Sequence, residues 1–162
     1  MEQIPDFWRT EVLHPLFVHF PIALLIMATI FKIATLWGKG KFLDIPGTIL
    51  LIIGTIGGWA AIYTGDLADG IVSRTICDPT VLKAHENHGY TMIWLFTAAV
   101  FIDVLYQFKF STFKISWAKG ILVLLMLIGT GYLGYVGHLG AQLVYQQAAG
   151  VYVPTSNCAE FN

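Results

Sequence analysis

The sequence predicts an all-α integral membrane protein, an antiparallel bundle of four transmembrane helices with both termini outside the cytoplasm. Three observations lead to this prediction. Of the 162 residues, 56% are hydrophobic and 12% are charged, whereas about a quarter of the residues in a soluble domain are charged. Four apolar stretches are long enough to cross a hydrocarbon layer of ~30 Å. The lysines and the histidines gather at opposite ends of these stretches.

The predicted spans belong to a single domain, 1–162, and cover residues 16–37, 46–64, 90–108 and 117–145. Residues that favour helix entry stand at three of their starts, namely Pro15, Asp44 and Ser116. Connections of about ten residues join the first span to the second and the third to the fourth, so the helices must alternate in direction. The fourth span exceeds the thickness of the hydrocarbon layer, and we expect it to project beyond the membrane surface.

The lysine distribution predicts the orientation, because cytoplasmic loops accumulate lysine and arginine. The lysines at the end with the two short connections are Lys32, Lys39, Lys41, Lys109, Lys114 and Lys119. At the opposite end, acidic residues outnumber Arg9, Arg74 and Lys83. We therefore expect that end, with the loop 65–89 and the tail 146–162, to face the outside.

Cys77 and Cys158 are the only two cysteines, and both fall on the predicted outer side. Disulfides persist in oxidising compartments, so we expect the two thiols to join and tie the tail to the outer loop. Two free thiols or separate intermolecular partners are the alternatives.

All five histidines fall near the predicted outer face: His14, His19, His85, His88 and His138. Any one of them alone fits an interfacial residue or a helix cap, and His14, just before Pro15, fits that interpretation best. His19 lies between apolar neighbours and His138 among glycines, where a polar ring needs a partner. Ionisable residues that converge inside a membrane bundle indicate a functional site.

Histidines on facing helices can hold a haem iron from both sides, and the flat macrocycle needs space between the helices. Glycines provide such space in the second and fourth spans, at Gly54, Gly57, Gly58, Gly131, Gly134, Gly137 and Gly140. The same glycines also fit close helix packing. Asp66 and Asp69 could orient a ligand histidine, supply an oxygen ligand to a metal, or cap the second span. No Cys-x-x-Cys-His motif is present, so we expect any haem to be bound non-covalently.

Several segments carry a resemblance to a known family. They are the opening His-Pro-Leu-Phe-Val-His-Phe-Pro at 14–21, the Gly-Asp at 65–66, the His85/His88 pair, and Gly-His-Leu-Gly-Ala-Gln-Leu-Val-Tyr at 137–145. Together they resemble an uncharacterised family of bacterial four-helix membrane proteins, over most of residues 13–153. The resemblance implies a multi-pass protein of the bacterial inner membrane and redox work with cytochrome c domains, to which some members are fused. One departure is the run Gln-Gln-Ala-Ala-Gly-Val at 146–151, where the family pattern has a Gly-Val-Gly-Val-like ending.

We therefore expect a b-type cytochrome-like subunit with one or two haems b in its outer half. It would pass electrons laterally to a cytochrome c or to other subunits of a redox complex, and it would not be a self-contained enzyme. The favoured ligands are His19 and His138, together with His85 and His88.

Two alternatives stay open. One is a non-haem zinc, copper or iron ion held by His19, His88, His138 and either Asp66 or Glu86. The other is a cofactor-free structural subunit whose polar layer forms a hydrogen-bond network.

The other possible partners are weighed by composition and residue type. A quinone pocket could use Tyr63, Trp59 and Trp94, although these aromatic residues also fit membrane-interface anchors. The net charge of −1 and the lack of a basic patch argue against a nucleic-acid partner.

Overall fold

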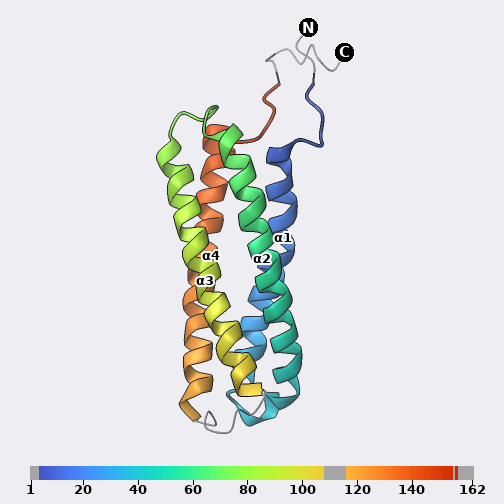
Figure 1. Ribbon diagram of the computed structural model, residues 1–162, viewed down its shortest axis with the longest axis vertical. Coiled ribbons are helices and arrows are strands. Elements are labelled where there is room, and N and C mark those ends of the chain that lie inside the picture. Colours follow the sequence, from blue (N-terminus) through green and yellow to red (C-terminus); the bar gives the residue numbers. More distant parts are fainter. Residues whose placement is uncertain (1–3, 108–115, 155, 157–162) are drawn as a thin grey trace.

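Four long helices form an elongated bundle in the computed structural model, which describes residues 4–107, 116–154 and 156 (Figure 1). The helices are α1 (Thr10–Ala34), α2 (Asp44–Val72), α3 (Pro79–Gln107) and α4 (Ser116–Gln147), with the short 3-10 helix η1 (Gly38–Leu43) between α1 and α2. Each long helix is apolar and long enough to cross a membrane. The prediction of an all-α, four-helix membrane protein is thus confirmed, while its orientation in the membrane stays a prediction.

The helices extend beyond the apolar stretches that the sequence marks. α2 continues to Val72 and α3 begins at Pro79, so most of the segment 65–89, expected as a loop, is helical. Hydropathy locates only the part of a helix that crosses lipid, and polar residues such as Asp66 continue the same helix beyond that part. α4 has 32 residues, which at ~1.5 Å per residue exceeds a hydrocarbon layer of ~30 Å.

The start of α3 is capped by Asp78, the residue just before the helix. The backbone N–H and the hydroxyl of Thr80 both donate to Oδ1 of Asp78, at 2.9 and 2.6 Å. These two hydrogen bonds hold the pKa of the Asp78 carboxyl below its usual value. Pro79 follows as the first helical residue, where its missing N–H costs nothing.

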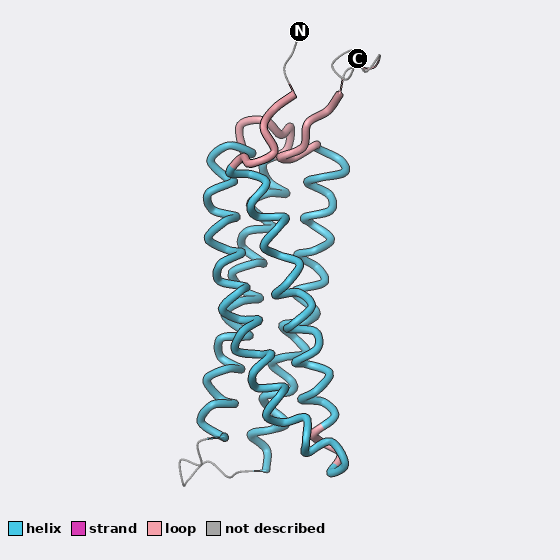
Figure 2. Tube along the Cα trace, turned by 90° about the vertical axis from the view of Figure 1, so that its right-hand side faces the viewer, coloured by secondary structure: helices cyan, strands magenta, loops and turns pink. Residues whose placement is uncertain are grey.

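The two ends of the bundle differ in chemistry. We call the end with the start of α1 and the end of α2 the histidine end, because His14 and His85 lie there, and the opposite end, with Lys32, the lysine end. Residues 4–9 and 148–154 both lie at the histidine end (Figures 1 and 2). Cys77 is exposed, whereas Cys158, Lys109 and Lys114 lie outside the described residues, so the disulfide stays a prediction.

The middle of the bundle is packed with apolar side chains. Leu25, Leu51, Ile93, Phe96 and Met126 are fully buried there. Two glycines allow close approach of neighbouring helices, because a Cβ on Gly54 would lie 3.0 Å from Leu25 and one on Gly129 would lie 3.0 Å from Phe96. The small-residue packing that membrane helices use therefore operates within both hairpins, α1–α2 and α3–α4.

A buried charge network closes the lysine end. The ammonium group of Lys32, whose side chain is 1% exposed, lies 2.8 Å from Asp44 Oδ1 and 2.7 Å from Asp103 Oδ2. It also donates to the Thr48 hydroxyl at 2.8 Å, and this hydroxyl donates to Asp103 Oδ2 at 2.7 Å. Lys119 binds the second oxygen of Asp44 at 2.9 Å. One network therefore ties together all four helices.

The two helix hairpins repeat one another. His14 and Lys32 of α1 correspond to His85 and Asp103 of α3, a separation of 71 residues (14 to 85, 32 to 103), and each corresponding pair is in contact. In the second helices the separation is 75 (44 to 119, 54 to 129), and Asp44 likewise meets Lys119. Corresponding residues meet near the centre, as expected for an approximate twofold axis along the bundle.

Replacement of Lys32 should destabilise the fold far more than replacement of Lys119. Lys32→Met leaves the buried Asp103 carboxylate without its cation, and we expect a loss of about 3–5 kcal/mol in the free energy of unfolding. Lys119→Met removes a cation that is 25% exposed, and we expect about 1 kcal/mol or less. Unfolding in mixed detergent micelles, followed by circular dichroism, measures both, and equal losses would contradict this account of the network.

Candidate functional site

A cavity of about 350 Å³ lies at the histidine end and is lined by all four long helices. Its floor is formed by Leu25, Met92 and Leu133, which belong to the packed middle of the bundle or lie next to it. Its upper part carries His14 and His85, while Ala149 and Gly150, just after α4, contribute at the mouth. The volume lies within the range of small-molecule and cofactor sites, roughly 300–1,000 Å³.

His14 is held from α1 against the neighbouring helix α2. Its Nδ1 lies 2.9 Å from the carbonyl oxygen of Ala61. A carbonyl oxygen can only accept, so Nδ1 carries the ring proton and Nε2 keeps its lone pair. The ring packs on Gly65, where an added Cβ would lie 3.1 Å from Nδ1, so Gly65 leaves the space that the ring occupies.

His85 is held in the same way by the second hairpin. Its Nδ1 lies 3.0 Å from the carbonyl oxygen of Val136 on α4, which again assigns the proton to Nδ1 and the lone pair to Nε2. The ring packs on Gly140, where a Cβ would lie 3.2 Å from its Cε1. Ala61 and Val136, and likewise Gly65 and Gly140, are 75 residues apart, so the two histidine settings are copies within the repeat.

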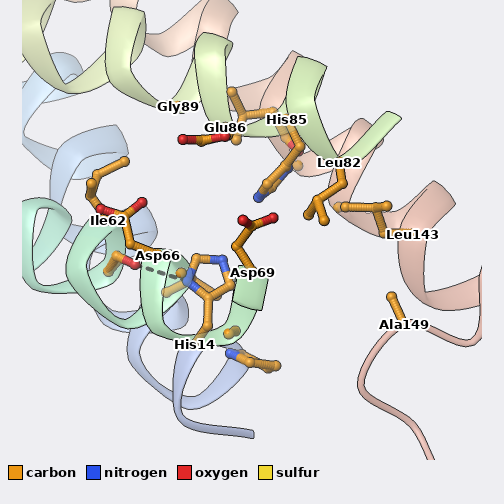
Figure 3. Close-up of a pocket in the computed structure, with 18 of the residues that line it drawn as sticks. His14, Ile62, Asp66, Asp69, Leu82, His85, Glu86, Gly89, Leu143 and Ala149 are labelled. Atoms are coloured by element: carbon orange, nitrogen blue, oxygen red, sulfur yellow. Dashed lines mark hydrogen bonds between the residues drawn. The ribbon is translucent and has the colours of Figure 1, made fainter. Parts of the chain in front are cut away.

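The two rings point toward one another across the upper part of the cavity (Figure 3). The centroids of the His14 and His85 rings are 5.9 Å apart and the ring planes are nearly perpendicular, at 89°. Both Nδ1 atoms are used by backbone carbonyls, so the nitrogens that remain for a ligand are the two Nε2 atoms. A hydrogen bond to a carbonyl from the other ring nitrogen is the usual outer support of a metal-binding histidine.

Four carboxylates line the cavity at or above the level of the rings, from Glu11, Asp66, Asp69 and Glu86. Glu11 pairs with Arg9 at 3.3 Å, Glu86 with Lys83 at 2.6 Å, and Asp66 accepts the hydroxyl of Tyr90 at 2.8 Å. Figure 3 shows Asp69 in the region between the two rings. The mouth is therefore an acidic rim above an apolar cavity.

The other three histidines lie away from the cavity lining. His19 is exposed, and its Nδ1 lies 2.6 Å from the carbonyl oxygen of Pro15 on its own helix. His138 is exposed and contacts Gln142, one turn further along α4, at 3.2 Å. His88 is half-buried against the rings of Tyr132 and Tyr135, with centroids 5.8 and 5.0 Å away. The structure thus brings together His14 and His85, the first of which the sequence made the best candidate for a cap.

The aromatic residues considered for a quinone lie on the α2–α3 side of the bundle. Tyr63 is 65% exposed and Trp94 is 59% exposed. Trp59 contacts the Trp94 ring at 5.1 Å and donates from its indole nitrogen to the hydroxyl of Thr97 at 3.1 Å. These three aromatic residues are not among those that line the cavity.

Within the described residues, no group of three or more His, Cys, Asp or Glu side chains is placed to hold a metal ion. Sequence reasoning did not single out Glu11 at the cavity, nor the pairing of Lys32 with Asp103 at the other end. Asp103 had a usable signal, because it is an ionisable residue inside the predicted span 90–108. Glu11 had none, since an acidic residue near a membrane surface is ordinary.

Comparison with known proteins identifies the family. The model of DUF2231, a family of predicted membrane proteins, matches residues 10–152. The chain belongs to this family. No curated protein and no solved structure matches the chain. The matched region contains the four helices up to their ends and both histidines of the cavity, so the site lies within the part that defines the family.

The assigned proton positions can be tested directly. We expect His14 and His85 to hold their ring protons on Nδ1, because each Nδ1 faces a carbonyl oxygen. Ring-nitrogen NMR of histidine-labelled protein distinguishes this tautomer from the Nε2–H form. His14→Gln and His85→Gln should each remove one Nδ1–H signal, and an Nε2–H signal lost in either variant would contradict the assignment.

Proposed function

We propose that this protein is a b-type cytochrome-like membrane subunit that holds one non-covalent haem between His14 and His85 and transfers electrons at its histidine end. One observation carries the proposal: two imidazoles with free Nε2 atoms face each other across a cavity, with centroids 5.9 Å apart. When bound, the haem supplies one-electron oxidation and reduction.

The spacing of the rings supports a metal centre between them. Two imidazoles that bind one metal from opposite sides have centroids about 6 Å apart, because each metal–nitrogen bond is ~2.0 Å and each nitrogen lies about 1.1 Å from its ring centre. A haem iron already has four nitrogens of the macrocycle and needs only two protein ligands. The two histidines therefore suffice for a haem, whereas an isolated ion requires three or four ligands.

The ligand pair proposed here differs from the pair that the sequence favoured. His19 and His138 are exposed on the outer faces of α1 and α4, and His88 is enclosed by two tyrosine rings. None of the three lines the cavity. We propose that they serve the membrane interface or helix contacts and that His14 and His85 are the axial ligands.

The position of the cavity supports lateral transfer at one face. Between the cavity and the lysine end lie fully buried apolar residues, among them Phe96 and Met126. The five histidines all belong to the half with the cavity, so a second haem site toward the lysine end has no histidine to use. We propose that electrons enter and leave at the histidine end, in exchange with a cytochrome c or another subunit of a redox complex.

The lysine distribution supports the placement of that face outside. Lysines at the opposite end match the cytoplasmic side of a bacterial inner membrane. The histidine end would then face the periplasm, where soluble electron carriers are available.

A spectrum tests the proposal. We expect the detergent-purified protein, supplied with haem, to show a sharp α band in its reduced-minus-oxidised spectrum and one iron per chain. His14→Ala and His85→Ala should each lose the six-coordinate spectrum, because each removes an axial nitrogen. His138→Ala is the matched control, since it changes a histidine of the same end that lies outside the cavity lining, and it should leave the spectrum unchanged.

Other outcomes select the alternatives. A stoichiometric zinc, copper or iron content without an α band would replace the haem with a non-haem ion, and Asp69→Asn should then lose metal as fully as the histidine variants. A colourless and metal-free protein that depends on a neighbour for stability would indicate a structural subunit.

A further inference from the structure

Arg9 carries the one buried side-chain nitrogen or oxygen atom among the described residues that has no hydrogen-bond partner. This atom is its Nε. Burying an N–H group without an acceptor costs roughly 1–3 kcal/mol, so such atoms are rare and require an explanation. A bound ligand that supplies the acceptor is one such explanation.

The other contacts of Arg9 are long. Its Nη1 lies 3.3 Å from Glu11 Oε1, and its Nη2 lies 3.5 Å from the carbonyl oxygen of Gly150. Charge-assisted hydrogen bonds between guanidinium and carboxylate are shorter, about 2.7–2.9 Å. The guanidinium is therefore held in place without being satisfied, and it has donors left for a further anion.

The contacts place Arg9 at the mouth of the cavity. Both of its partners, Glu11 and Gly150, line the cavity. Gly150 has a positive φ of 67°, and this left-handed turn brings the segment after α4 back to the start of α1, with the Gly150 position 3.6 Å from the Glu11 side chain. Arg9 and Gly150 thus form one side of the mouth.

The charges around the mouth are unequal. The side formed by α2 and α3 carries the carboxylates of Asp66, Asp69 and Glu86, and the one cation paired with them is Lys83, on Glu86. An anionic group is repelled from that side and attracted to Arg9. A ligand with an acidic edge has one favourable orientation in this mouth.

We propose that Arg9 binds a carboxylate of the ligand, and that for the haem of the proposed function this group is a propionate. This inference rests on the proposed function, and it deepens it by fixing the edge of the haem that faces the mouth. The propionate edge lies toward Arg9 and Gly150, while the apolar edge lies toward Leu25, Met92 and Leu133 at the floor. Arg9 is a positioning and binding residue, distinct from the two axial histidines.

A comparison of two porphyrins tests this inference. Iron protoporphyrin IX has two free propionates, and its dimethyl ester has none. We expect Arg9→Gln to speed the loss of iron protoporphyrin IX to an acceptor apoprotein about tenfold or more, as expected for a lost charge-assisted hydrogen bond. With the dimethyl ester, wild type and Arg9→Gln should lose the ligand at the same rate. Arg74→Gln, which removes an exposed cation after α2 that is not among the lining residues, should behave as wild type with both porphyrins.

Two further measurements make the result decisive. Arg9→Lys retains the charge and should restore part of the retention of iron protoporphyrin IX, and circular dichroism confirms that each variant is folded. If Arg9→Gln and wild type lose iron protoporphyrin IX at equal rates, Arg9 does not bind a propionate, although the haem site stands. If Arg9→Gln speeds the loss of both porphyrins equally, Arg9 supports the fold and the inference is overturned. A wild-type protein that takes up neither porphyrin overturns the proposed function together with this inference.

Discussion

The Lys32 ammonium group is the interaction on which the arrangement of the four helices depends. A charged group with 1% exposure is tolerated only when oxygen atoms surround it, and here Asp44, Thr48 and Asp103 supply them from α2 and α3. Lys119 extends the network to α4. Each of these contacts holds only at one rotation and one height of its helix. The network therefore fixes the register of all four helices at the lysine end.

That register determines what meets at the other end. Lys32 and Asp103 are corresponding positions of the two hairpins, and so are His14 and His85. When the first pair is brought together on the approximate twofold axis, rigid helices bring the second pair together as well. The glycines that receive the histidine rings, Gly65 and Gly140, are corresponding positions too. The histidine pair is therefore a consequence of a repeat whose other contact is a buried ion pair.

Hydropathy was enough to predict the helices, and the one-sided histidines were enough to predict at which end a site would lie. The choice between His14 and His19 was beyond both signals. The two residues are about 140° apart around a helix at ~100° per residue, so they face different directions. In a helix surrounded by lipid, apolar neighbours on every side give no clue to the buried face, which is why the apolar setting of His19 was uninformative. The repeat spacing of 71 residues would have selected His14, since position 85 is a histidine whereas position 90, the counterpart of 19, is a tyrosine.

The two polar ends of the bundle differ in how completely their groups are satisfied, and this difference is the strongest argument for a function at the histidine end. At the lysine end, cations and carboxylates use one another as partners, so the network has nothing left to offer a ligand. At the histidine end, two Nε2 acceptors face the cavity and the Nε donor of Arg9 is buried without a partner. Acceptors deep in an apolar cavity and a cation at its mouth match a molecule that is apolar and electron-accepting at its centre and acidic at one edge. Haem has this distribution, whereas a structural contact between helices would have no use for it.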